Sequence, residues 1–331
     1  MSTRYAILMA GLAAVVAVLF VASLLIGPAA IGLGDSLAAL FRGEGEMVTL
    51  VMREVRLPRA ILGVLVGAAL GLSGAAMQGL LRNPLAEPGL IGTSASAALG
   101  AVISIQTGLS VAFVWALPAA ALLGALISVG LILLLAGSRG TTLTIILAGI
   151  GISALAGALT SLVLNLSPNP FAASEIMFWM MGSLADRSMV HVGIAAPLIV
   201  LGGLITLSRA RALDALTLGE DAAASMGVNI RALRLWLIVG TAALVGAATA
   251  VAGAIGFVGL VVPHLLRRAV GARPARLLPA SALGGGAVVL AADIAVRLIA
   301  PDRDLKLGVL TAIVGAPFFL HLILRTRRDA A

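Results

Sequence analysis

The sequence predicts an all-α integral membrane protein of about ten transmembrane helices, folded as a single transmembrane domain over residues 1–331. Composition is the first reason: 61% of the residues are hydrophobic and only 11% are charged, whereas soluble domains carry about 25% charged residues. The second reason is a series of long uncharged runs, such as those between Arg4 and Asp35 and between Glu87 and Arg139. Because a helix crosses a hydrocarbon core about 30 Å thick with roughly 20 apolar residues, each run can hold one or two spans.

Breaks within the apolar runs set the order of the expected helices. Gln106-Thr-Gly108 divides the longest run, Pro168 follows the fifth helix, and Pro263 makes the eighth helix short and irregular. The first run is too long for a signal-peptide core and lacks a clear cleavage site, so we expect it to be retained as a helix. The expected spans are 5–27, 57–81, 90–106, 112–136, 142–165, 190–208, 232–252, 257–270, 278–299 and 306–324.

Ten spans place both termini on one side, and the basic residues indicate which side. With cytoplasmic termini, 14 of the 22 Lys and Arg residues fall in inner segments and 8 in outer ones, as the positive-inside rule requires. Arg53, Arg56 and Arg59 depart from the rule by gathering just before the second helix. The net charge of +8 therefore reflects topology, and because aromatic residues are scarce it does not indicate nucleic acid as a partner.

Two blocks of sequence recur in the same order, which indicates an internal repeat. Val66-Gly-Ala-Ala69 followed by Gly74 returns as Val245-Gly-Ala-Ala248 followed by Gly253, and a Leu-Pro-Ala block further along each half also recurs. Helices 2–5 would then correspond to helices 7–10. Because an odd number of spans separates the copies, they would run in opposite directions, as in many transporters. The alternative is chance similarity between helices rich in Ala and Gly.

The second expected helix carries Gly63, Gly67 and Gly71 at intervals of four residues. Small residues at this spacing let helix backbones approach closely in lipid. We therefore expect a close helix crossing here rather than chemistry, the alternative being the general tolerance of glycine in membrane helices.

No sequence motif indicates that the chain itself uses ATP or an ion gradient to drive transport. A nucleotide-binding P-loop needs a lysine in a glycine-rich context, and the single lysine, Lys306, lies in an unrelated one. Asp293, the acid placed within a span, can pair with Arg297 one turn later, which we favour over a proton relay. The three histidines lie far apart in the sequence, so structural roles are expected, with an axial contact to haem iron left open. An ion-coupled transporter would need more intramembrane acids, and a membrane enzyme would need a clustered polar site.

A polar segment at 213–228 lies on the expected cytoplasmic side. Thr217 and Glu220 have the spacing of a capping box, in which each side chain bonds the other residue's exposed backbone amide. A short helix is expected from Leu218 to Met226, and Gly227 suits a left-handed C-terminal cap. Two interpretations stay open, an ordinary interfacial loop and a lever that docks into a partner.

Several motifs together resemble the FecCD-type permeases, the membrane subunits of type II ABC importers for iron-siderophores, haem and vitamin B12. The resemblance runs from about residue 50 to the C-terminus, and two of the motifs are highly specific. These motifs are Asn83-Pro-Leu-Ala-Glu-Pro-Gly89 and Gly256-Phe-Val-Gly-Leu-Val-Val-Pro-His264. Weaker matches are Arg56-Leu-Pro-Arg59, Gly67-Ala-Ala-Leu70, Gly74-Ala-Ala-Met-Gln78, Leu218-Gly-Glu-Asp-Ala-Ala223, Ala292-Asp293 and Gly315-Ala-Pro317.

The resemblance implies an assembly in the bacterial inner membrane, with both termini of this multi-pass subunit in the cytoplasm. Its expected partners are a second copy of the chain, two ATP-binding cassette subunits, a periplasmic substrate-binding protein and the lipid bilayer, with no nucleic acid. ATP and Mg²⁺ would bind the partner ATPase, so this subunit is expected to be a channel without a cofactor, a metal site or a catalytic residue. ATP would close the ATPase subunits, move segment 213–228 and switch the gates.

The resemblance also implies the residues that carry each role. The expected ATPase-coupling residues lie within 213–228 and are Leu218, Gly219, Glu220, Asp221, Met226 and Gly227. The expected docking residues for the binding protein are Arg56, Arg59 and Arg297, and the cytoplasmic gate is Thr141, Thr142 and Leu143. The outer gating segment is 171–183, with Phe178, Trp179 and Met180; its alternative interpretation is an aromatic anchor at the membrane interface.

The resemblance leaves three classes of cargo open. Haem, ferric siderophores and vitamin B12 all suit this architecture. Leu143 is apolar where the B12 permeases have further polar residues at the gate. We therefore expect haem or another iron chelate as the cargo, with a ferric siderophore or vitamin B12 as the alternative.

Overall fold

A computed structural model describes residues 3–27, 31–136, 142–300 and 305–329, and all regular elements in these ranges are helices. The longer ones are α1 (Thr3–Leu25), α4 (Leu57–Leu80), α7 (Ala116–Ala136), α8 (Thr142–Asn165), α10 (Met189–Ser208), α13 (Ile230–Ala252), α15 (Pro274–Ile299) and α16 (Leu307–Asp329). The shorter ones are α2 (Leu33–Phe41), α3 (Glu46–Leu50), η1 (Val51–Arg56), η2 (Pro88–Ile91), α5 (Thr93–Gln106), α6 (Leu109–Ala112), α9 (Pro170–Met180), α11 (Ala210–Leu216), α12 (Glu220–Ser225) and α14 (Val258–Arg267).

The all-α membrane class is confirmed, and each of the ten expected helices is present with ends shifted by a few residues. Within the described ranges, 7 helices are long and apolar enough to cross a membrane by length and composition. The other three expected spans, Thr93–Gln106, Val258–Arg267 and Leu307–Leu322, are apolar but shorter. A count of ten spans and the inverted repeat therefore stay predictions.

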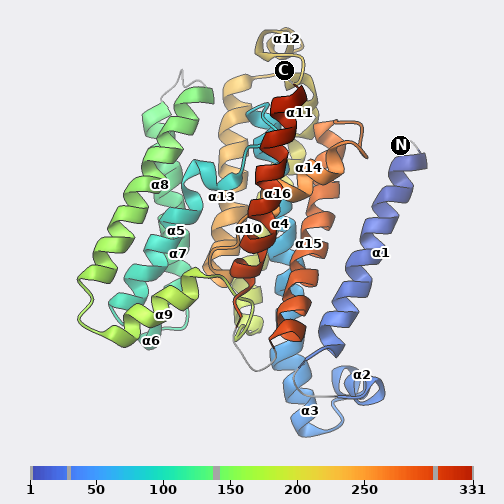
Figure 1. The fold of residues 1–331 in the computed structure, drawn as a ribbon, viewed down its shortest axis with the longest axis vertical. Helices are drawn as coiled ribbons and strands as arrows, with labels where there is room; N and C mark the ends of the chain where they lie inside the picture. Colours follow the sequence, from blue (N-terminus) through green and yellow to red (C-terminus); the bar gives the residue numbers. More distant parts are fainter. Residues whose placement is uncertain (1–2, 28–30, 137–141, 301–304, 330–331) are drawn as a thin grey trace.

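The helix that contains α4 is much longer than expected. Helical turns run without a break from Glu46 to Leu80, a stretch of 35 residues. At 1.5 Å per residue it is about 50 Å long, whereas the hydrocarbon core is about 30 Å thick. Its first part, α3 and η1, therefore extends beyond the membrane beside α2 at the bottom of Figure 1.

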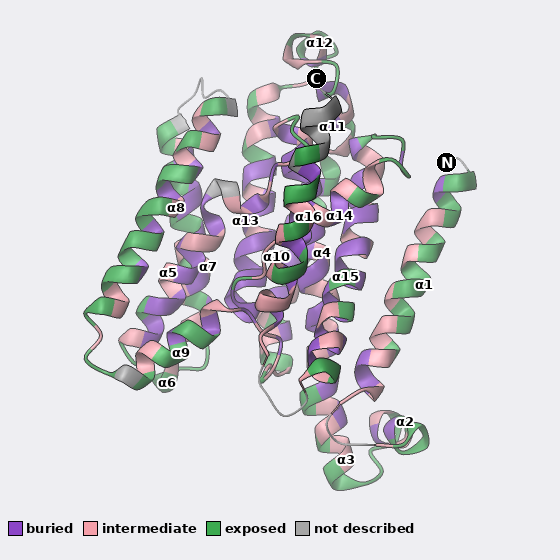
Figure 2. Ribbon diagram, viewed as in Figure 1, coloured by how far each residue is buried: buried purple, intermediate pink, exposed green. Residues whose placement is uncertain are grey.

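The core lies around α4, which packs against α15, α13, α14 and α10. Most of α4 and α13 is buried, as the purple ribbon of Figure 2 shows. A Cβ atom on Gly67 would overlap the carbonyl oxygen of Gly285, and one on Gly71 would overlap that of Ser281. The expected close crossing is confirmed, because α4 and α15 touch backbone to backbone at these glycines.

The two ends of the molecule differ. Both termini and helices α11 and α12 lie at one end, whereas α2, α3 and α6 lie at the other (Figure 1). In its most apolar window α1 is only 6% buried, and its buried residues, Tyr5, Ser23 and Leu24, are confined to its two ends. Helix α1 is therefore a peripheral helix that is fixed to the bundle at its ends.

Candidate functional site

The expected coupling segment forms two short helices, α11 and α12, that are anchored by one face and exposed on the other. Leu213 and Ala223 are fully buried, at 0% exposure. Leu218 and Met226 are 68% and 64% exposed. Two large apolar side chains thus face outward on a segment whose own core is closed.

Asp214 fixes α11 to the start of a core helix. Its Oδ1 accepts a hydrogen bond of 2.8 Å from the backbone N–H of Ala275, in the first turn of α15. A carboxylate at a helix N-terminus is stabilised by the helix dipole and by the unpaired amides there. A displacement of α11 would therefore be transmitted to α15, which is packed along α4.

Glu220 pairs with a core helix and does not form the expected capping box. Its Oε1 lies 2.6 Å from Nη2 of Arg234 in α13. The hydroxyl of Thr217 instead donates to the carbonyl oxygen of Asp214 at 2.6 Å, and no side chain caps α12. The capping-box prediction is wrong because Gly219, with φ 106° and ψ 160°, occupies the N-cap of α12 in place of Thr217.

The C-terminal end of α12 follows the prediction. Gly227 has φ 85°, and it donates to the carbonyl oxygen of Ala224 while Val228 donates to that of Ala223. This pair of bonds is the Schellman motif, which glycine favours because it lacks a Cβ atom. Exposed Asp221 completes the set, so the structure brings all six expected coupling residues together at one end of the molecule.

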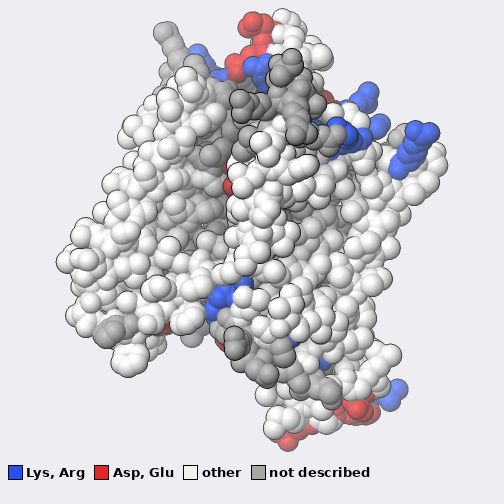
Figure 3. All heavy atoms as spheres, viewed as in Figure 1, with Lys and Arg blue, Asp and Glu red and all other residues white. Residues whose placement is uncertain are grey.

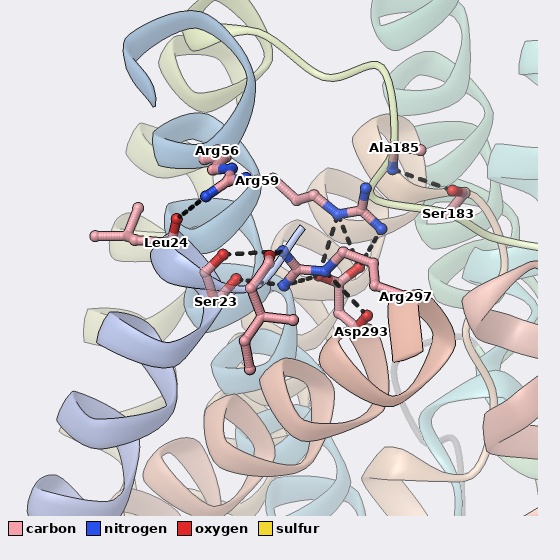
Figure 4. A network of polar contacts seen from close by, with 9 residues as sticks. Ser23, Leu24, Arg56, Arg59, Ser183, Ala185, Asp293 and Arg297 are labelled. Atoms are coloured by element: carbon pink, nitrogen blue, oxygen red, sulfur yellow. Dashed lines mark hydrogen bonds and ion pairs between the residues drawn. The ribbon is translucent and has the colours of Figure 1, made fainter. Parts of the chain in front are cut away.

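At the other end, two arginines converge on one buried carboxylate (Figure 4). Asp293 has a side chain only 2% exposed. Arg59 donates to it through Nε and Nη2, with Nη2 2.8 Å from Oδ1, and Nη2 of Arg297 lies 2.9 Å from Oδ2. The expected Asp293–Arg297 pair is confirmed, and Arg59 from α4 adds a second, forked partner of the kind that arginine geometry favours.

The same cluster holds the end of α1. Arg56 Nη1 donates to the carbonyl oxygens of Leu24 and Leu25 at 2.9 and 3.0 Å. Arg297 Nη1 donates to the carbonyl oxygen of Ser23 at 2.9 Å, and its Nη2 donates to the Ser23 hydroxyl at 2.7 Å. These carbonyls have no partner within the helix, so cations at this position stabilise the C-terminus of α1.

Asp293→Asn is expected to lower the stability of the protein strongly. The change leaves two largely buried guanidinium groups without their counter-charge, and breaking a buried pair in this way costs about 3–5 kcal/mol. The measurement is the Tm of the purified protein in detergent. Glu44→Gln is the matched control, because Glu44 pairs with Arg42 at 3.7 Å with both side chains largely exposed, and exposed pairs contribute little. Equal Tm values for the two variants would contradict this account of the cluster.

The expected outer gating segment is largely helix α9. Phe178 is 53% exposed, with Nζ of Lys306 5.4 Å from its ring centroid. Trp179 is buried and Met180 is half-buried. The backbone after α9 packs closely on the end of α13. The backbone N–H of Ser183 donates to the carbonyl oxygen of Ala252 at 2.8 Å, and a Cβ atom on Gly253 would overlap the carbonyl oxygen of Trp179.

The expected cytoplasmic gate is only partly visible. Thr141 lies outside the described residues, and so does the side chain of Thr142, which begins α8. Leu143 is 64% exposed. The gating roles of these residues and of α9, the coupling role of α11–α12, and the docking role of Arg56, Arg59 and Arg297 remain predictions.

A contact that the sequence did not predict joins the two specific motifs. Glu87 Oε1 accepts a hydrogen bond of 3.1 Å from the backbone N–H of Phe257, which has φ 67° just before α14. Glu87, Ser94 and Thr249 line a cavity of about 170 Å³ between α4, α13 and the loop that follows α13. The sequence signal for this contact was that Glu87 lies in one specific motif and Phe257 in the other. The two residues are 170 positions apart, so no local pattern indicated that they meet.

Among the described residues, no group of three or more His, Cys, Asp and Glu side chains could hold a metal ion. His191 bonds within its own helix start, where its Nδ1 accepts from the backbone N–H of Ser188. His264 packs edge-on against Phe318, with ring centroids 6.1 Å apart. These contacts are compatible with structural roles for both histidines, which stay predictions.

Comparison with known proteins gives consistent similarities. The model of the FecCD transport family matches residues 15–325. The chain is 42% identical to a hemin transport system permease protein of Yersinia pestis. The matched region is 279 residues long and covers 83% of each chain. The chain is 40% identical to a cobalamin import system permease protein of Halobacterium salinarum, over 86% of this chain and 76% of that one. A solved structure described as an inward-facing metal-chelate type ABC transporter matches with a TM-score of 0.86 at 32% identity, over 96% of this chain and 98% of that one.

Proposed function

Since the chain belongs to the FecCD transport family of ABC importer permeases, we propose that it forms the membrane channel of an ATP-driven importer of haem or another iron chelate. The observation that carries the proposal is the pair α11–α12, with Leu218 and Met226 exposed and Asp214 and Glu220 bonded to core helices. A ferric siderophore or vitamin B12 is the alternative cargo. Hydrolysis of ATP belongs to a separate subunit, since the chain has one lysine and no P-loop.

Coupling follows from the anchors of α11 and α12. An ATPase subunit that pushes on Leu218 and Met226 moves a segment bonded to α15 through Asp214 and to α13 through Glu220. Both core helices pack on α4. A force at the exposed end therefore tilts the central helices together and alternates the two gates. In this orientation α11, α12 and both termini face the cytoplasm, and α2, α3 and α6 face the periplasm.

A second copy of the chain would complete the pathway. Helix α16 carries Ile313, Val314 and Leu320 at 62–65% exposure. Beside them an apolar groove of about 330 Å³ runs between α14, α15 and α16. Burial of this surface against the same surface of a second copy gives a symmetric dimer with the path between the subunits.

The outer arginines suit an acidic binding protein. Arg59 and Arg297 share the Asp293 carboxylate, and Arg56 bonds the carbonyl oxygens at the end of α1, so the cluster has an excess positive charge at the outer end. Of the two arginines that pair with Asp293, Arg59 has the more exposed side chain, at 18% against 7% for Arg297. Complementary charge at such a surface speeds encounter and sets the docking register.

Haem is favoured among the cargoes on two grounds. The relative that transports hemin is 42% identical over most of the chain. The exposed face of α8, next to the expected gate, is apolar and includes Leu143, Leu147 and Leu155 at 57–64% exposure. An apolar wall suits a flat porphyrin better than a polar chelate.

The cargo is tested by uptake into proteoliposomes that hold the chain with its ATPase and binding protein. Haem, a ferric siderophore and vitamin B12 are supplied outside in parallel, with ATP inside. We expect ATP-dependent uptake of haem that exceeds the uptake of the other two. Uptake of only the siderophore or only B12 would overturn the haem assignment and leave the importer intact.

A further inference from the structure

The start of α1 lies against a turn that is unusually rich in arginine. Tyr5 donates through its hydroxyl to the carbonyl oxygen of Arg276 at 3.3 Å, and the guanidinium carbon of Arg276 lies 5.4 Å from the Tyr5 ring centroid. Arg268 and Arg273, which flank the turn between α14 and α15, are exposed, and so is Arg4. Arg276 thus contacts the first turn of α1, which also carries Arg4, while Arg268 and Arg273 lie at the end of α14 and the start of α15.

Little negative charge in the protein balances this cluster of Arg4, Arg268, Arg273 and Arg276. The sequence contains no Asp or Glu before Asp35, and none between Asp221 and Asp293. In the part of the chain that the structure describes, none of the four arginines forms an ion pair. The nearby acid Asp214 directs Oδ1 at the backbone of Ala275.

The position of the cluster indicates a lipid rather than a protein ligand. Helix α1 is exposed over most of its length, so acyl chains surround it in a bilayer. The cluster lies at the end of this helix and at the ends of α14 and α15, which is the level of the lipid headgroups. Figure 3 shows blue side chains gathered over the start of α1 and the neighbouring turn, at the edge of the molecule and set back from α12.

We propose that Arg4, Arg268, Arg273 and Arg276 form a binding site for the headgroup phosphate of an anionic phospholipid. Basic recesses between membrane helices on the cytoplasmic side are suited to such headgroups, because each arginine near the surface attracts anionic lipid. The guanidinium fork matches phosphate oxygens. The bound lipid fills the corner between α1 and α15 and adds to the attachment that Tyr5 and the partly buried Leu8, Met9 and Leu12 give to α1 at this end.

The proposal is tested by the stabilisation that added lipid gives to the purified chain in detergent. Phosphatidylglycerol, phosphatidylcholine and inorganic phosphate are added separately, and Tm and the number of retained lipids in native mass spectra are recorded. The test variant is Arg268→Gln/Arg273→Gln, which spares the Tyr5–Arg276 contact. The control is Arg211→Gln/Arg231→Gln, which removes two exposed arginines at the same end of the molecule.

We expect phosphatidylglycerol to raise Tm in the wild type and the control, with about 30-fold weaker apparent binding in the test variant. Equal stabilisation of the test variant, or an equal loss in the control, overturns the site. An equal rise with inorganic phosphate assigns it to a free anion instead of a lipid. An equal rise with zwitterionic phosphatidylcholine would show that the arginines do not select an anionic headgroup and would also overturn the proposal.

Discussion

Replacing Gly74 by leucine is expected to prevent the chain from reaching its folded state. A Cβ atom on Gly74 would overlap the carbonyl oxygen, the carbonyl carbon and the Cα atom of Gly259. These are backbone atoms of α14, so no side chain can rotate away, and α4 would have to separate from α14. Overpacking a core typically costs 1–3 kcal/mol, and a leucine against backbone lies at or above the upper end of that range. The measurement is the yield of monodisperse protein in detergent, together with Tm.

Gly157→Leu is the matched control for this prediction. Gly157 lies in α8, where a Cβ atom would meet nothing within 4 Å. Its replacement adds the same hydrocarbon to an exposed helix face, so we expect nearly unchanged yield. A normal yield of Gly74→Leu, or equal damage from both changes, would show that close packing of α4 on α14 is not what holds the core.

Glu220→Arg is expected to abolish ATP-driven uptake. The change places two cations together where Glu220 and Arg234 lie 2.6 Å apart, and it cancels the negative charge of the first turn of α12, where Asp221 is the other acid. Like charges at this distance would drive α12 away from α13, so a force on α12 would no longer reach the core. Uptake in proteoliposomes that contain the ATPase and the binding protein measures the effect.

A charge-swapped variant separates the two consequences of this change. Glu220→Arg combined with Arg234→Glu restores an ion pair between α12 and α13 but leaves the exposed charge reversed. We expect Tm to recover and uptake to stay lost, because the outward charge meets the ATPase. Recovery of uptake would assign the role of Glu220 to the internal pair alone. Normal uptake by the single variant would remove the coupling role from α12.

The long uncharged runs predicted the spanning helices because each helix that crosses the lipid needs one continuous apolar run in the sequence. Helices α2 and α3 were missed for the same reason: 33–50 carries Asp35, Arg42, Glu44 and Glu46, so no apolar run marks it. The continuation of α4 back to Glu46 was hidden because the arginines before Leu57 resembled the end of a span. Charge thus marks where a helix leaves the hydrocarbon core, not where it ends.

The candidate sites were predicted where their contacts are local in sequence. The pairing of Asp293 with Arg297 follows from a spacing of one helical turn, and Gly227 follows from cap chemistry. The pairing of Asp293 with Arg59 spans 234 residues, and no periodicity indicates it. The capping box failed because Gly219 occupies the N-cap position of α12, and the Glu220 carboxylate instead pairs with Arg234 of α13.

The most direct test of the central claim is the energy source for uptake by the reconstituted chain. Proteoliposomes with and without the ATPase subunit are compared, with ATP or a non-hydrolysable analogue inside, and with a proton or sodium gradient as the alternative drive. The account predicts uptake only when the ATPase and hydrolysable ATP are both present. Uptake without the ATPase, driven by an ion gradient, would contradict it.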